Sequence, residues 1–322
     1  MRTPLLDRLD VDHLRRALVE AESLGYDSLW VADHFQTGRE AAILECWTFM
    51  SWVSRVTTTM RIGSIHLAHL FRNPALTAKL AATLDHISGG RLEFFYEAGS
   101  PASRREVESY GFGFLDDADR MAAFEEAVRI VKLMWTEDRP SFRGRFYSID
   151  RAVCYPRPIQ KPHPPVWIGT FGDRAADPSY GLAAAQLGAI AKHADGWNST
   201  PVSVDDAAKV LKALSKACSE AGRPFSSLAL SLETEMLIAS SASRVRELQG
   251  LIERRNPGGA FADWARIGQS FVIGDPPAVT RKIEQYVELG ISRFMIWFMD
   301  YPSLDGMRTF AAQVMPYFRG RA

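Results

Sequence analysis

Apolar residues along the chain follow two periods in turn, one typical of helices and one typical of short buried strands. The first helix carries its apolar positions at Leu14, Ala17, Leu18, Ala21 and Leu24. Gly25 follows as a helix stop, and the apolar run 28–32 (SLWVA) is typical of a buried parallel strand. The pattern therefore predicts a helix and then a strand at the start of the chain.

The same alternation continues along the rest of the chain. Apolar patterns predict further helices over 45–56, 75–87, 119–135, 182–193, 205–221, 243–254, 277–289 and 304–318. They predict further strands over 61–67, 91–97, 166–169, 195–198, 228–238 and 293–298. Asn73 and Pro74 are typical of a helix N-cap and a first helical residue. The segment 155–165 holds five prolines, so we expect it to be extended.

A strand–helix unit that recurs about every 30 residues predicts a parallel sheet. We expect one domain over residues 1–322, a TIM-type (β/α)8 barrel, with an excursion near 136–165 and a lid near 173–190. An open doubly wound sheet is the rival, but its GxGxxG turn is absent from the sequence. Because 1–10 is a poor strand, the barrel is expected to lack or alter its first strand. This segment, a lid or a second chain would then cover the gap.

Composition narrows the class of protein. The 38 Lys and Arg residues balance 38 Asp and Glu residues, which argues against bulk electrostatic binding of nucleic acid. Cys46, Cys154 and Cys218 are too few and too scattered for a disulfide framework or a CxxC metal site. No apolar run reaches the roughly 18 residues of a membrane span, and no signal peptide is evident. We expect a cytoplasmic enzyme without a metal, a membrane or a nucleic-acid partner.

Five segments in this order resemble the bacterial luciferase-like monooxygenase family of flavin- or deazaflavin-dependent oxidoreductases. They are 21–35 (AESLGYDSLWVADHF), 71–93, 154–169, 193–198 (HADGWN) and 274–298. The resemblance implies a two-component monooxygenase that uses oxygen and reduced FMN from a separate flavin reductase on a hydrophobic organic substrate. Two alternatives stay open, namely hydride transfer with the deazaflavin coenzyme F420 and a non-catalytic barrel. Relatives are commonly dimeric, so a homodimer is expected.

The C-terminal ends of the strands carry the site in a parallel barrel. By resemblance, His34 is the candidate general base or stabiliser of a flavin intermediate, and Asp33 is its partner or a contact of the flavin ring. His66 is a further catalytic candidate. In deazaflavin-dependent relatives a non-prolyl cis peptide backs the cofactor ring, and the matching position here is Ile65–His66.

The residues expected to contact the cofactor lie at several strand ends. They are Ile65, His66, Glu97, Gly99, Gly169, Thr170, Phe171, Gly172 and Asn198. The loop 169–172 would hold the cofactor phosphate, because backbone N–H groups ahead of a helix favour anions. Phe95 and Glu97 stand where relatives commonly carry glycine, so we expect them to alter the usual pose of the cofactor.

Overall fold

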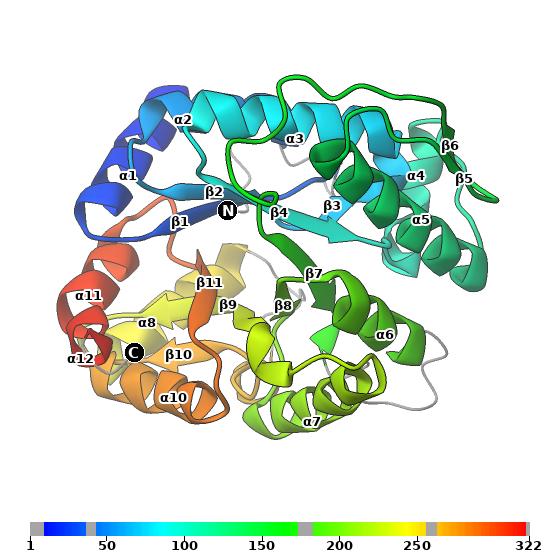
Figure 1. Cartoon of the computed structure of the whole chain (residues 1–322). Helices are drawn as coiled ribbons and strands as arrows, with labels where there is room; N and C mark the ends of the chain where they lie inside the picture. Colours follow the sequence, from blue (N-terminus) through cyan, green and yellow to red (C-terminus); the bar gives the residue numbers. More distant parts are fainter. Residues whose placement is uncertain (1–9, 37–42, 173–182, 256–262, 320–322) are drawn as a thin grey trace.

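The computed structural model describes residues 10–36, 43–172, 183–255 and 263–319. Figure 1 shows a mostly parallel sheet that forms a nearly closed barrel with helices around its outside. The strands of this sheet are β1 (Ser28–Val31), β2 (Arg61–Ser64), β3 (Leu67–Ala68), β4 (Leu92–Glu97), β7 (Val166–Thr170), β8 (Gly196–Ser199), β9 (Ala229–Ile238), β10 (Val272–Gly274) and β11 (Arg293–Phe298). The helices are α1 (Val11–Ser23), α2 (Cys46–Val56), α3 (Pro74–Ser88), α4 (Arg104–Ser109), α5 (Asp117–Thr136), α6 (Ala183–His193), α7 (Val204–Glu220), α8 (Ala242–Arg255), α9 (Trp264–Ile267), α10 (Pro276–Glu288), α11 (Asp305–Gln313) and α12 (Met315–Phe318).

Neighbouring strands pair in the order β1-β2-β4-β7-β8-β9, and every pair in this path is parallel. The long strand β9 pairs with β8 through its first half and with β10 through its last three residues. Its other edge pairs with β11. Because parallel strands with intervening helices bring their C-terminal ends to one side, the segments that follow β1, β2, β4 and β9 meet at one mouth of the barrel.

The barrel wall is open between β1 and β11, since no strand among the described residues pairs with the outer edge of either. A cavity of about 140 Å³ lies in this opening. Trp30 of β1, Trp297 of β11, Leu18 of α1 and Met307 of α11 are among its lining residues. The expectation that the first strand is missing or altered therefore holds for the described chain. The segment 1–9, which was one candidate to cover the gap, lies outside the described residues.

Side chains at the helix ends explain several of the boundaries. Asn73 accepts a hydrogen bond from the backbone N–H of Ala75 (2.9 Å), Pro74 is the first residue of α3, and Gly89 ends the helix at φ 71°. This cap was predicted. Helix α5 begins two residues earlier than expected, because Asp116 caps it.

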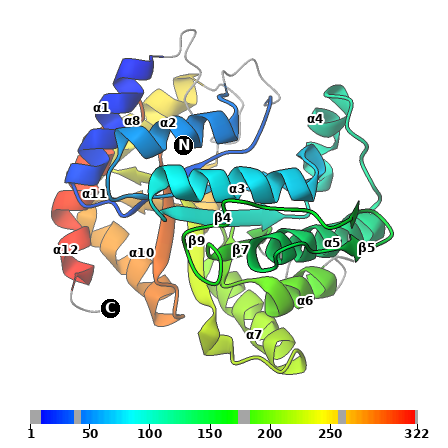
Figure 2. The same ribbon diagram turned by 45° about the horizontal axis from the view of Figure 1, so that its top comes forward.

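Helices α3 and α5 cover β4 and close one side of the main core, as Figure 2 shows. Trp135 is fully buried between them, and its indole N–H donates to the carbonyl oxygen of Ala78 (2.9 Å). A buried indole therefore keeps its hydrogen bond while its ring fills the core. The cluster continues under α6 and α7 through residues such as Trp197 and Leu214.

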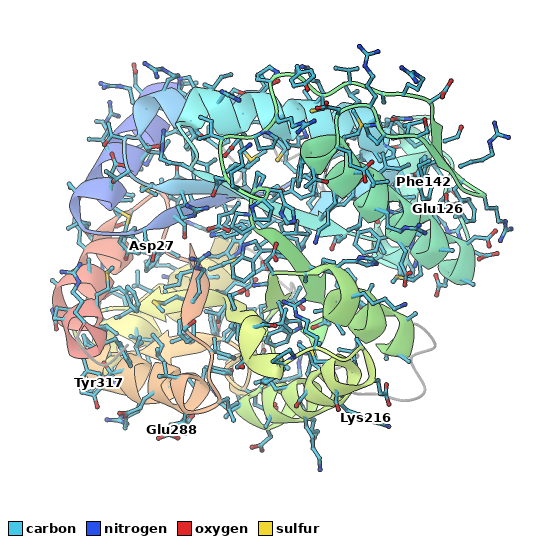
Figure 3. All side chains as sticks on the ribbon, in the orientation of Figure 1. Asp27, Glu126, Phe142, Lys216, Glu288 and Tyr317 are labelled. Carbon is cyan, nitrogen blue, oxygen red and sulfur yellow. The ribbon has the colours of Figure 1, made fainter. Side chains whose placement is uncertain are left out.

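The predicted excursion near 136–165 contains a small antiparallel hairpin of β5 (Phe142–Arg143) and β6 (Ser148–Ile149). The carboxylate of Glu126 on α5 accepts hydrogen bonds from the backbone N–H groups of Arg145, Phe146 and Tyr147 at 2.7–3.0 Å. Figure 3 shows Glu126 and Phe142 at this edge of the molecule. One carboxylate thus holds the hairpin on α5. The proline-rich segment that follows contains no helix, as expected.

Other predicted elements need correction. The strand expected over 61–67 is divided into β2 and β3 by the peptide bond between Ile65 and His66. The helix expected over 304–318 is two helices, because the chain leaves helical hydrogen bonding before Met315–Pro316. Helix α4 and strand β10 were not predicted. Of the expected lid, 173–182 lies outside the described residues and 183–190 forms part of α6.

Candidate active site

Aromatic side chains fill the barrel beneath its mouth. Trp30, Phe95, Trp167 and Met295 form one buried cluster with Ile65. Glycines on neighbouring strands make room for the rings. A Cβ atom on Gly63 would lie 2.4 Å from Trp30, one on Gly196 would lie 2.3 Å from Trp167, and one on Gly169 would lie 2.7 Å from Phe95. Gly169 therefore has a packing role, whatever its part in cofactor binding.

Phe95 lies below the mouth rather than in it. Its side chain is fully buried, and its ring centre is 4.7 Å from that of His66. The bulky residue at this position is therefore compensated inside the barrel by Gly169.

His66 lies between two carboxylates from different strands. Its Nδ1 is 3.8 Å from Glu97 at the end of β4, and its Nε2 is 3.3 Å from Glu233 of β9. Burial lowers the pKa of this imidazole, but the charges of Glu97 and Glu233 outweigh burial and raise it to about 8. Burial also raises the pKa of Glu97. The three side chains keep only 13–16% of their surface exposed.

The peptide bond that precedes His66 is cis, and Ile65 is not followed by proline. This non-prolyl cis bond was predicted at this position. It ends β2 and turns the chain into β3, which places the His66 side chain over Phe95. The imidazole therefore reaches the centre of the mouth from a break in the strand.

His34 forms a second pair with a residue that the sequence patterns did not single out. Its Nδ1 is 2.8 Å from Oε2 of Glu106 on α4. Oε1 of Glu106 accepts hydrogen bonds from the backbone N–H groups of Phe35 (2.5 Å) and Gln36 (3.2 Å). The hydrogen bond to Glu106 raises the pKa of His34. His34 is 46% exposed, so its free nitrogen is accessible, whereas Glu106 is 8% exposed.

Asp33 is not the hydrogen-bond partner of His34. Its buried carboxylate instead forms two hydrogen bonds with the guanidinium of Arg72, at 2.8 and 2.9 Å. Arg72 also donates to Glu45 (2.9 Å), which caps α2. Asp33 therefore anchors the end of β1 to the segments after β3 and before α2, and Glu106 takes the role of partner that was expected of Asp33.

The remaining expected contacts are distributed around the mouth. Gly99 and Gly172 have φ of 77° and 54°, which suits glycine. Phe171 lies 6.4 Å from the ring centre of His66. Thr170 is buried, and its hydroxyl accepts a hydrogen bond from the indole of Trp197 (3.1 Å), so its side chain faces the helix layer. A phosphate contact by the loop 169–172 stays a prediction.

Asn198 lies inside the barrel, fully buried. Its amide donates to the hydroxyl of Ser231 (2.9 Å) and approaches the sulfur of Met295. This amide is therefore held from β8 against β9 and β11. A contact between Asn198 and a cofactor also stays a prediction.

Two acidic residues of the site were missed from the sequence. The sequence carries a signal for Glu233, because Ser231, Glu233 and Glu235 recur at every second position of β9 and so share one face of the strand. Glu106 carries no such signal. It lies among charged residues in 104–108 (RREVE), and only the fold brings it to His34, 72 residues away in the chain.

Among the described residues, no group of three or more His, Cys, Asp or Glu side chains is placed to hold a metal ion. None of the described helices is long and apolar enough to cross a membrane.

A nearly closed parallel barrel with acid–base residues at its C-terminal mouth places the chain among enzymes of the TIM-barrel class. The family model for luciferase-like monooxygenases matches residues 3–293, and the chain belongs to this family. The matched relatives are oxidoreductases.

One relative is an F420-dependent glucose-6-phosphate dehydrogenase from Kineococcus radiotolerans. It is 24% identical over 321 residues, which cover 94% of this chain and 91% of the relative. Two solved structures share the fold. An F420-dependent secondary alcohol dehydrogenase has a TM-score of 0.77 at 20% identity, over 94% of this chain and 93% of the other. The monooxygenase RslO1 from Streptomyces bottropensis has a TM-score of 0.78 at 21% identity, over 95% and 93%.

Proposed function

We propose that this chain is an F420-dependent oxidoreductase that transfers hydride between the deazaflavin and a substrate with an alcohol or carbonyl group. The observation that carries the proposal is the His34–Glu106 pair, which can hold and release one proton at the exposed face of the imidazole. The F420 dependence of the Kineococcus relative favours the deazaflavin over reduced FMN. The FMN monooxygenase with a separate reductase is the second candidate.

Several residues at the mouth fit a flat cofactor. The ring of His66 lies next to that of Phe95, and Gly99 brings no side chain to the turn after β4. Phe95 packs against Gly169 inside the barrel. We assign Ile65, His66, Glu97, Gly99, 169–172 and Asn198 to cofactor binding. When bound, the deazaflavin would supply a carbon that accepts or donates hydride.

The protein supplies proton transfer and orientation. In the oxidative direction, neutral His34 takes the hydroxyl proton of the alcohol at Nε2 while hydride leaves the carbon that bears the hydroxyl. Nδ1–H of His34 stays directed at Glu106, whose charge stabilises the imidazolium that forms. In the reductive direction, the imidazolium returns the proton to the carbonyl oxygen. Asp33 and Arg72 hold the end of β1, which carries His34, in place.

Turnover with each cofactor tests the proposal. We expect the absorbance of oxidised F420 to fall in the absence of oxygen when a secondary alcohol is added, and no product with reduced FMN. Incorporation of labelled oxygen into product with reduced FMN would support the monooxygenase instead. If neither F420 nor reduced FMN shows saturable binding by fluorescence, the barrel is non-catalytic and both candidates fail.

The expected homodimer is also a proposal. Four exposed apolar side chains lie along α3 and the segment that crosses it, namely Leu76, Ile87, Tyr155 and Ile159. Hydrogen bonds from Lys79 to Tyr155 and between His86 and Arg157 hold the two elements together. We assign the contact to this surface. Sedimentation of the wild type and of Leu76→Arg would test it, with a monomeric wild type as the contradicting result.

A further inference from the structure

The ionisable groups in contact around His34 and His66 include more carboxyl groups than basic groups. The carboxyl groups are Asp33, Glu45, Glu97, Glu106 and Glu233, and the basic groups that contact them are Arg72, His34 and His66. Burial raises the pKa of Glu97, but the balance stays negative even with Glu97 protonated. A ligand that contacts these described side chains therefore meets an excess of negative charge.

Each of these basic groups already contacts a carboxylate. Arg72 contacts Asp33 and Glu45 at 2.8–2.9 Å, and its side chain is 10% exposed. His34 contacts Glu106. Arg72 and His34 therefore offer no free charge to bind a phosphate group.

Both ring nitrogens of His66 face a carboxylate. Glu97 faces Nδ1 and Glu233 faces Nε2. A protonated His66 with two ionised carboxylates carries a net charge of one negative unit. An anion placed above this group would be attracted by one charge and repelled by two at similar distances, and the low water content strengthens both effects.

We infer that the substrate of this site is an uncharged or cationic alcohol rather than a phosphate ester, and that Glu97 and Glu233 set this preference. The inference rests on the proposed function and adds the charge of the substrate to it. It also separates this chain from the Kineococcus relative, whose name specifies glucose 6-phosphate.

Three alcohols of similar shape test the inference: trans-4-methylcyclohexanol, trans-4-aminocyclohexanol and trans-4-hydroxycyclohexanecarboxylate. They are neutral, cationic and anionic at pH 7.5, and glucose 6-phosphate is measured beside them. We expect kcat/KM with F420 to be lowest for the two anions, with the neutral alcohol favoured over the carboxylate by at least about tenfold. Equal or higher kcat/KM for either anion would overturn the inference.

Two matched variants identify the source of the preference. Glu233→Gln keeps the shape of the side chain and removes its charge, so the neutral-to-anion ratio should fall by about tenfold. Glu108→Gln is the control, because Glu108 is an exposed glutamate that pairs with Arg104 on α4. It should leave the ratio unchanged. A ratio that Glu233→Gln does not move would overturn the assignment to Glu233.

A binding measurement separates this inference from the proposed function. Dissociation constants of the same three alcohols are measured without turnover, from the His66 ring signals in protein labelled at histidine. If F420 is not turned over, the proposed function fails, and the order of these constants still decides the inference. Weakest binding of the anionic alcohol supports the inference. A reversed order, or the absence of binding by any of the three alcohols, overturns it.

Discussion

Glu106→Gln isolates the charge of Glu106 while it preserves the shape of the side chain. Glu106 accepts three hydrogen bonds, one from His34 and two from the backbone N–H groups of Phe35 and Gln36. The oxygen of the glutamine amide can keep both backbone bonds, but its NH2 group cannot accept a hydrogen bond from Nδ1 of His34. The substitution therefore removes one charge-assisted hydrogen bond and leaves the loop in place.

The size of the effect follows from this single lost contact. A charged hydrogen bond contributes about 1.5–3 kcal/mol, but His34 is 46% exposed, so we expect the free energy of unfolding to fall by only about 1 kcal/mol. The effect on kcat should be larger, about 10- to 100-fold, because the imidazolium formed during alcohol oxidation loses its counter-charge. His34→Gln removes the base itself and should cost about 10²- to 10⁴-fold.

The pH profile distinguishes a role in proton transfer from a structural role. Glu106 raises the pKa of His34 by its hydrogen bond, so Glu106→Gln lowers that pKa. Alcohol oxidation needs neutral His34, and its rate falls as the pH drops below the pKa of this group. The acidic limb of kcat/KM should therefore move to lower pH in Glu106→Gln and stay in place in the control Glu108→Gln. An unmoved limb in Glu106→Gln would refute His34 as the base.

Three further substitutions test the supports of the site. His66→Gln should remove a stabilising contribution of about 2 kcal/mol, because the folded protein raises the pKa of His66 to about 8. This contribution is complete below pH 6.5 and is lost as the pH rises through about 8. Urea unfolding at pH 6 and 9 measures it, and an equal loss of stability at both pH values would contradict it. Gly169→Ala should destabilise by about 1–3 kcal/mol, since its Cβ would lie 2.7 Å from the Phe95 ring, and the added Phe95→Leu should restore part of the thermal stability. Arg72→Gln should cost about 3–5 kcal/mol in chemical unfolding because it leaves buried Asp33 unpaired, and a cost below 1 kcal/mol would exclude Arg72 as its main partner.

Local patterns were enough to predict most of the fold. The cap at Asn73 and Pro74 depends on neighbours along the chain, and the structure has it as expected. Apolar spacing did not separate 61–67 into two strands, although the family resemblance had placed a cis bond at Ile65–His66. The division of 304–318 into α11 and α12 was equally invisible, since the apolar spacing continues through Pro316.

The site was predicted less completely because its partners are distant in the sequence. His34 and His66 were found from their positions at strand ends. Their partners were not, since Glu106 comes from a short helix and Glu233 from a strand that reads as mainly apolar. Phe95 shows a different case, in which the residue was singled out from the sequence but its contact was not. Its bulk was noted from the sequence, but its packing against Gly169, a residue 74 positions further along the chain, could be found only from the fold.

The opening in the barrel wall lies beside β1, yet the proposed base follows directly after that strand. Three contacts fix the end of β1 from the continuous side of the sheet. Arg72 binds Asp33 from the segment after β3, and Glu106 binds both His34 and the backbone of Phe35 from the segment after β4. The opening lies on the other side of β1, where Trp30 lines the cavity. The position of His34 therefore depends on β3, β4 and α4, and a strand that fills the gap would stabilise the barrel without being needed to orient the base.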